Sequence, residues 1–166
     1  MNLFLMRHAN AGIPRENPLL DDRRALVKDG KEQCMLMARL LNAMRVQPDL
    51  ILSSPLKRCL QTAQFVGTEL GYEAPVVIAP ALAPDSDYTA FLDLLSEHAE
   101  LENLFLVGHN PNLFYFIGRL IAGSDGAAIR IRKASVTRIN MDTHPPRLQW
   151  LVDPRMAKSI ITSLKH

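Results

Sequence analysis

The sequence predicts an α/β fold: a three-layer sandwich with a mainly parallel central sheet, helices on both faces and an antiparallel C-terminal strand portion. Two observations favour this class. Up to Gly123, short apolar runs alternate with stretches of helical period, as parallel strands joined by helices do. After Gly123 the period becomes two, and the last strands follow one another without a full-length helix between them, which is typical of antiparallel pairing.

Length and composition are those of one globular domain. The 166 residues are 48% hydrophobic and 22% charged, so a single domain over 1–166 can bury a sizeable core. The net charge of +2 is too small to indicate a nucleic-acid partner. No apolar run reaches membrane-spanning length and no signal peptide is apparent, so we expect a cytoplasmic protein without a membrane partner. Nothing in the sequence predicts an oligomeric state.

The first strand is predicted over Leu3–Met6, and Arg7 and His8 follow where it would end. Ligands of open α/β sheets bind outside the carboxyl ends of the strands, so this pair would face the ligand crevice. By itself, the pair fits equally well an arginine that caps the strand and a histidine held in the turn. The polar stretch 9–27 is predicted as a loop, either functional or merely solvated.

The next elements repeat the pattern of strand and helix. A helix is expected over 29–45 and a second buried strand over 50–52. Ser53-Ser54-Pro55 is typical of an N-cap serine and a proline at the first helical position. This places Arg58 in the first turn of a helix, where free backbone N–H groups and the helix dipole favour anions.

The middle of the chain contains two further predicted strands, 76–78 and 104–107. A short amphipathic helix begins at Tyr88, and the segment Gly108-His109-Asn110-Pro111 leads from the fourth strand into another helix. Asn110 is expected to cap that helix and Pro111 to start it.

The C-terminal part reads as strands over 129–139 and 147–152 and a helix over 154–164. Arg130 and Arg132 alternate with isoleucines, so the basic stretch that ends at Lys133 is interpreted as the solvated face of a strand. Trp150 is expected in the core. Cys34 and Cys59 have no spacing suited to a metal site and are interpreted as reduced core thiols.

Three separate strand ends thus carry polar residues to one edge of the sheet. These are Arg7-His8, the segment from Ser53 to Arg58, and His109. Arginine forks match phosphate oxygens and helix N-termini add positive potential, so together these residues favour a phosphoryl group.

Here the sequence resembles the histidine phosphatase superfamily (phosphoglycerate-mutase-like), on LFLMRHA at 3–9, SSPLKRCLQTA at 53–63 and LVGHNP at 106–111. Ala9 stands where many members have glycine. Within the superfamily the chain looks most like the SixA-type phosphohistidine phosphatases. Three weaker motifs carry that likeness: DDRRALVKDG at 21–30, LAPDSD at 82–87 and LQWLVDP at 148–154.

The resemblance implies a role for each matching residue. His8 looks like a nucleophile that is transiently phosphorylated, and Arg7, Arg58 and His109 look like the phosphate pocket. Arg24 falls where the SixA-type pattern has an arginine near the phosphate. Charge stabilisation by these side chains needs no cofactor and no metal, and the sequence contains no metal-ligand cluster.

The expected proton donor is where this sequence departs from the pattern. Many superfamily members have a glutamate in the loop after the third strand, but here the loop reads Leu82-Ala83-Pro84. Asp85 and Asp87 are the nearest carboxylates. Asp87 matches a SixA-type position, but an N-cap for the helix from Tyr88 is the better explanation of it. A missing acid favours phosphohistidine, because imidazole can be protonated before it leaves.

We therefore expect a phosphatase that removes phosphoryl groups from phosphohistidine on a partner protein, such as a phosphotransfer or phosphocarrier domain. A phosphatase for a small phosphoester is the alternative enzyme. A non-catalytic phosphoprotein-binding module is the alternative from another class, although binding alone would not require His8.

Overall fold

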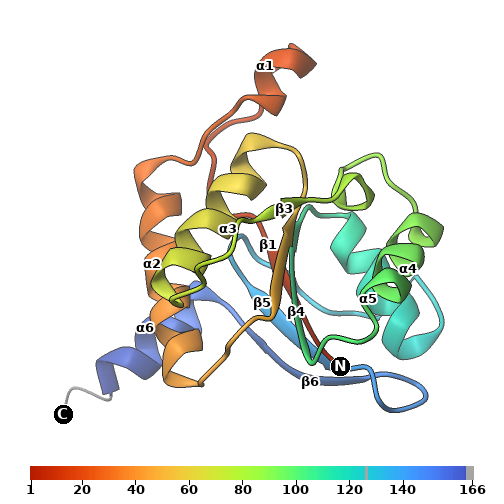
Figure 1. Ribbon diagram of the computed structural model, residues 1–166. Coiled ribbons are helices and arrows are strands. Elements are labelled where there is room, and N and C mark those ends of the chain that lie inside the picture. The colour runs from red at the N-terminus through yellow and green to blue at the C-terminus, as the bar shows by residue number, and fades with distance from the viewer. Residues whose placement is uncertain (126, 164–166) are drawn as a thin grey trace.

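A computed structural model describes residues 1–125 and 127–163 and contains one six-stranded sheet (Figure 1). The strand order is β3-β2-β4-β1-β5-β6. The first four strands are parallel, and β5 pairs antiparallel with both β1 and β6. Their bounds are β1 (Asn2–Arg7), β2 (Leu50–Ser53), β3 (Val77–Ile78), β4 (Asn103–Gly108), β5 (Val136–Asn140) and β6 (Arg147–Val152). The mixed sheet confirms the predicted fold class.

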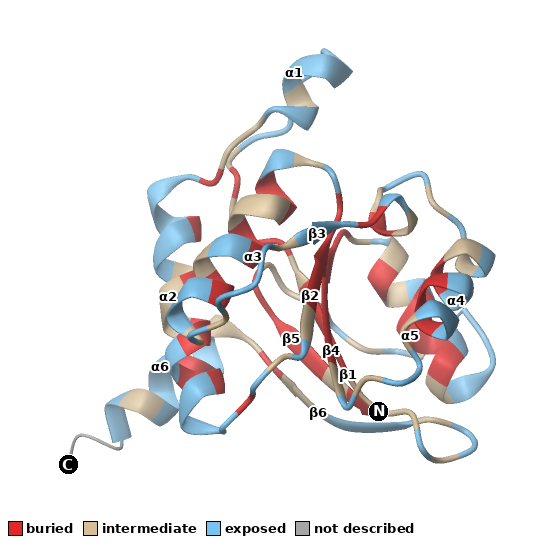
Figure 2. Cartoon of the chain, in the orientation of Figure 1, coloured by how far each residue is buried: buried red, intermediate tan, exposed pale blue. Residues whose placement is uncertain are grey.

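Helices cover both faces of the sheet, with apolar sides turned inward (Figures 1 and 2). One face carries α2, α3 and α6, and the other carries η1, α4 and α5. Their bounds are α2 (Lys28–Ala43), α3 (Lys57–Glu69), η1 (Pro80–Leu82), α4 (Tyr88–Glu97), α5 (Asn112–Ala122) and α6 (Pro154–Ser163). Residue 164, at the end of the predicted last helix, lies outside the described residues.

The central strands are buried on both sides because their side chains alternate between two core layers. In β1, Phe4 and Met6 pack with α2 and α3, whereas Leu3 and Leu5 pack with α4 and α5. Trp150 of β6 lies 6.0 Å from Phe4 between ring centroids and packs against the first layer, where it was expected. Cys34 and Cys59 are buried free thiols, also as predicted.

The register brings the polar strand ends to one edge. Arg7 pairs with Gly108 across β1 and β4, and Ser53 pairs with Val107 across β2 and β4. Backbone bonds continue one residue further, from His8 N to Gly108 O at 3.0 Å and from Ser54 N to Val107 O at 3.0 Å. The predicted convergence of three strand ends is therefore present.

Two helix starts were predicted wrongly. Helix α3 begins at Lys57, with Leu56 as its N-cap, so Ser53-Ser54-Pro55 forms the connection and not the cap. Arg58 still lies in the first turn, as expected. Helix α5 begins at Asn112 after Pro111, which supplies no side-chain cap. Asn110 instead donates from Nδ2 to Ile131 O at 3.3 Å.

Three segments also differ from the prediction. Residues 129–132 form no strand, because the Ile131 carbonyl accepts hydrogen bonds from the Arg7 and Asn110 side chains and not from a strand partner; β5 begins at Val136. The third strand is only the exposed pair Val77–Ile78. The expected loop 9–27 contains a short helix, α1 (Pro18–Asp22), capped by the Asn17 side chain.

None of the helices in the described part of the chain is long and apolar enough to cross a membrane. The cytoplasmic location stays a prediction.

Candidate active site

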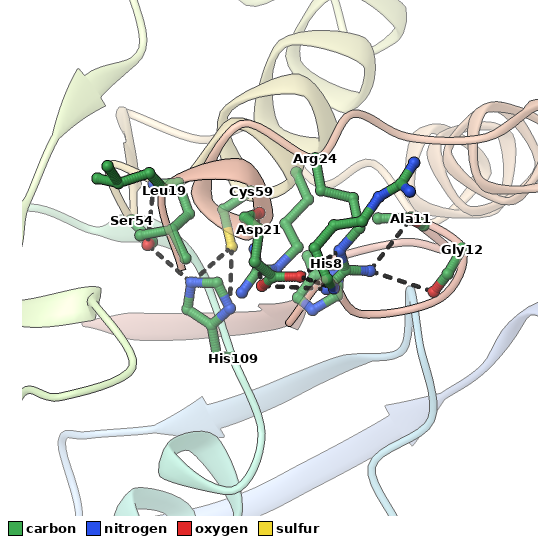
Figure 3. Close-up of polar contacts among 12 residues, drawn as sticks. His8, Ala11, Gly12, Leu19, Asp21, Arg24, Ser54, Cys59 and His109 are labelled. Atoms are coloured by element: carbon green, nitrogen blue, oxygen red, sulfur yellow. Dashed lines mark hydrogen bonds and ion pairs between the residues drawn. The ribbon is translucent and has the colours of Figure 1, made fainter. Parts of the chain in front are cut away.

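His8 follows β1 directly and is buried at the sheet edge (Figure 3). Its Nδ1 lies 2.8 Å from the Ala9 carbonyl oxygen, an acceptor, so Nδ1 carries the proton and Nε2 keeps its lone pair. The pKa of His8 is lowered to about 4, chiefly by burial. The hydrogen bond to Ala9 raises this pKa, and the positive charges of Arg58 and Arg7 lower it. At neutral pH, Nε2 of His8 is therefore unprotonated and has a free lone pair.

Two arginines lie near His8 on different elements, Arg7 at the end of β1 and Arg58 in the first turn of α3. Arg7 Nη1 donates to Ile131 O at 2.9 Å, and Arg58 Nη1 donates to Asp21 O at 3.0 Å. The Nε–H groups of both are buried without a hydrogen-bond partner in the described ranges. Burial lowers the pKa of each guanidinium, but arginine stays charged in proteins. Both thus retain donors for an anion.

His109 follows β4 and is buried beside His8, with 5.3 Å between the ring centroids. Its Nε2 lies 2.8 Å from Ser54 Oγ and 3.3 Å from Cys59 Sγ, contacts that fix the ring (Figure 3). Burial, together with smaller contributions from His8 and Arg58, lowers the pKa of His109 to about 3. The two imidazoles are therefore both neutral at physiological pH.

Arg24 lies in the same cluster, although its hydrogen bonds go to the loop around it. Its Nε donates to Asp21 Oδ1 at 2.8 Å, and its Nη1 donates to the carbonyls of Ala11 and Gly12. The charge of Arg24 nevertheless lowers the pKa of His8. Whether Arg24 also binds phosphate stays a prediction.

The two carboxylates considered as acids lie in the loop before α4. Asp85 and Asp87 are both exposed. Asp87 Oδ1 accepts a hydrogen bond from Ala90 N at 2.9 Å, which makes Asp87 the N-cap of α4. The N-cap role that the sequence suggested for Asp87 is thus confirmed. An acid role for Asp85 or Asp87 stays a prediction.

The sequence did not single out three polar residues that organise this site. Ser54 holds His109, and buried Thr62 accepts a hydrogen bond from Ala9 N at 3.1 Å while it donates to Arg58 O. Asp21 pairs with Arg24 at 2.8 Å and with Arg58 at 3.3 Å. All three stand in quoted motifs, Asp21 in 21–30 and Ser54 and Thr62 in 53–63, but their roles depend on tertiary contacts that the motifs do not show.

The glycine that ends that motif has a physical role. A Cβ on Gly30 would lie 2.0 Å from the Asn10 carbonyl oxygen, so no other residue allows α2 to approach the segment after His8 so closely. Val27 N also donates to the Asn10 carbonyl oxygen, at 3.1 Å. The motif therefore seats α2 and its preceding loop against the segment that carries His8.

Residues 3–83 match the sequence model of a protein family, the histidine phosphatase superfamily (branch 1). An uncharacterised protein of a Picosynechococcus species is 33% identical over 156 residues, which cover 92% of each chain. The chain belongs to the histidine phosphatase superfamily. The phosphohistidine phosphatase SixA of Escherichia coli (strain K12) is 26% identical over 167 residues, covering 96% of this chain and 100% of that protein.

A solved structure of the protein histidine phosphatase SixA with tungstate gives a TM-score of 0.80 at 24% identity. It covers 93% of this chain and 98% of that one, and at this identity it shows the shared fold alone. The full-length match to E. coli SixA supports the SixA-type branch for this superfamily member. Membership in this superfamily and the match to a phosphatase over the full length support phosphatase activity for this chain.

Proposed function

We propose that this phosphatase removes the phosphoryl group from phosphohistidine on a partner protein, such as a phosphotransfer or phosphocarrier domain, through a transient phospho-His8. One observation carries the proposal: His8 is neutral, its Nδ1–H is held by the Ala9 carbonyl, and two arginines lie near it. This is the state that nucleophilic attack on a phosphoryl group requires.

In the first step, Nε2 of His8 forms a bond to phosphorus while the bond from phosphorus to the substrate nitrogen breaks. The substrate side chain leaves as a neutral imidazole: the electron pair of the broken bond stays on the leaving nitrogen, and the other ring nitrogen was protonated beforehand. A water oxygen then attacks phosphorus and the bond to His8 Nε2 breaks. The product leaves as dihydrogen phosphate with both of the water's protons, and it can release one of them to solvent. Arg7, Arg58 and His109 stabilise the oxygens, so the reaction needs no metal.

The state of the carboxylates supports phosphohistidine over an alkyl phosphate. An alkoxide leaves slowly without a proton donor. Hydrogen bonds from Arg15 N and from the Arg24 side chain lower the pKa of Asp21, so this carboxylate stays ionised and is a poor acid. Asp87 is engaged as a helix cap. Phosphohistidine needs no such proton donor, because its imidazole is protonated before it leaves.

Phosphate release from two substrates tests the proposal. One is a phosphohistidine-bearing carrier protein, and the other is p-nitrophenyl phosphate, whose good leaving group needs no acid. His8→Ala is expected to lower release from the carrier by roughly a thousandfold or more, because the nucleophile is removed. The matched control is His144→Ala, which changes an exposed histidine in the loop between β5 and β6.

The wild type is incubated briefly with radiolabelled carrier and the reaction is quenched. The phosphatase chain should then carry an alkali-stable, acid-labile label, which the His8→Ala chain lacks. Release from p-nitrophenyl phosphate alone would replace the proposal with the small-phosphoester alternative. Release from neither substrate by folded wild type would leave the phosphoprotein-binding module.

A further inference from the structure

A basic groove opens beside the phosphate pocket and shares Arg7 with it. The groove has a volume of about 370 Å³, and among the described residues that line it, five are basic and none is acidic. The five are Arg7, Arg130, Arg132, Lys133 and Arg155. Positive charge therefore continues from the proposed catalytic site along one side of the protein.

Three separate segments build this groove because the sheet brings their ends together. Met6 of β1 pairs with Val136 of β5, which pairs with Val152 of β6. The end of β1, the segment before β5 and the start of α6 consequently meet at the same edge, and Ala134 N donates to Arg7 O at 3.1 Å. The stretch 130–133, interpreted from sequence as the solvated face of a strand, thus lines a groove next to His8.

The basic side chains differ in how far they are already neutralised. Arg132 Nε pairs with Asp153 Oδ2 at 3.0 Å, which ties the segment before β5 to the start of α6. Lys133 Nζ donates to Asn10 Oδ1 at 3.0 Å, a neutral acceptor. Arg130 and Arg155 are exposed and form no ion pair with any residue in 1–125 or 127–163.

Lys133 shows that positive charge is concentrated here. Partial burial lowers its pKa, and repulsion from Arg7 and Arg24 acts in the same direction more strongly than the attraction of Asp29. An anionic group in the groove would relieve this repulsion.

We propose that the groove binds the carboxylates that flank the phosphorylated side chain of a protein substrate, so that Arg130, Lys133 and Arg155 select acidic phosphoproteins. The inference rests on the proposed function, since it assigns the neighbours of the group that His8 attacks. An acidic segment fits the charges because they come from three segments along an open groove and not from one compact cradle. A net charge of only +2 argues against a nucleic-acid backbone as the occupant.

Two synthetic peptides test the inference, each with one phosphohistidine flanked on both sides by glutamates or by glutamines. The measured quantity is the ratio of kcat/KM for the glutamate peptide to kcat/KM for the glutamine peptide. In the wild type this ratio should be about ten and fall as salt rises. In R130Q/R155Q it should fall by about tenfold, since two partly exposed charge pairs are removed.

The control is Arg147→Gln, which removes one arginine charge at the start of β6, at the opposite end of the sheet. It should leave the ratio at the wild-type value. A merely structural effect of R130Q/R155Q would lower both kcat/KM values together and leave the ratio unchanged. A wild-type ratio near one, or a ratio unchanged in R130Q/R155Q, overturns the subsite while the proposed function stands. If the wild type hydrolyses neither peptide, the proposed function itself is overturned.

Discussion

The buried imidazoles of His8 and His109 link catalysis to stability. Both rings are less than a tenth exposed, with pKa values of about 4 and about 3 against an ordinary 6.5. Below pH 6.5 the unfolded chain binds protons on these rings that the folded chain does not bind until about pH 4. Their contribution to the free energy of unfolding is therefore complete above pH 6.5 and declines as the pH falls toward 4.

His109→Gln should make the protein less sensitive to acid. Between about pH 7 and about pH 5, a histidine whose pKa falls this far on folding loses about 2 kcal/mol of its contribution to stability. Urea unfolding at the two pH values should thus show a smaller loss of stability in His109→Gln than in the wild type, by about that amount. An equal loss in both proteins would contradict the burial of a neutral His109.

At the scale of elements, α1 differs from every other helix of the fold. None of its residues is buried, and it projects from the body of the protein (Figures 1 and 2). Asp21 holds it through the Arg58 and Arg24 side chains, and Arg15 N bonds to the same carboxylate at 2.8 Å. A segment attached by polar contacts and not by apolar burial belongs to the low-stability end of a structure.

Asp21→Asn should therefore loosen α1 without unfolding the protein. Amide hydrogen exchange over residues 13–22 is expected to rise several-fold, while exchange in α2 stays at the wild-type rate. Asp22→Asn is the matched control, because exposed Asp22 forms no ion pair with another described residue. Equal exchange in both variants would show that the Asp21 pairs do not hold α1.

At the scale of the whole molecule, one sheet separates two apolar layers that share its strands. Phe91 of α4 is fully buried in one layer, and Trp150 packs against the other. Because β1 and β4 contribute side chains to both layers, neither layer can be lost without the strands. We expect residues 1–166 to unfold as one cooperative domain.

Phe91→Ala should lower the free energy of unfolding by about 3–5 kcal/mol, since it leaves a cavity in a full layer. The midpoint of urea unfolding should shift equally by circular dichroism and by Trp150 fluorescence, although Trp150 lies across the sheet. Leu92→Ala, at a position that is 40% exposed, should cost less than about 1 kcal/mol. A Trp150 transition that stays at the wild-type midpoint would show two independent units.

Local sequence patterns predicted most of the elements. The apolar runs at Leu3–Met6 and 104–107 are continuous because strands buried on both faces need no alternation, and they became β1 and β4. The helices 29–45 and 88 onward were predicted from their 3.6-residue period to within two residues. Errors fell where tertiary contacts override a local signal. Ser54 bonds His109 in place of capping α3, and the Ile131 carbonyl bonds the Arg7 and Asn110 side chains although 129–132 has the alternating pattern of a strand.

The sequence by itself determined the α/β class, the strand ends that carry Arg7, His8, Arg58 and His109, and the resemblance to a superfamily. These features depend on residue type and spacing along the chain. Only the tertiary structure decided the tautomer of His8, the pairing of Asp21 with Arg58, and the groove that joins Arg130 and Arg155 to Arg7. Each depends on which backbone carbonyl, carboxylate or cation a distant segment brings within a few ångströms, and burial sets the pKa values that follow.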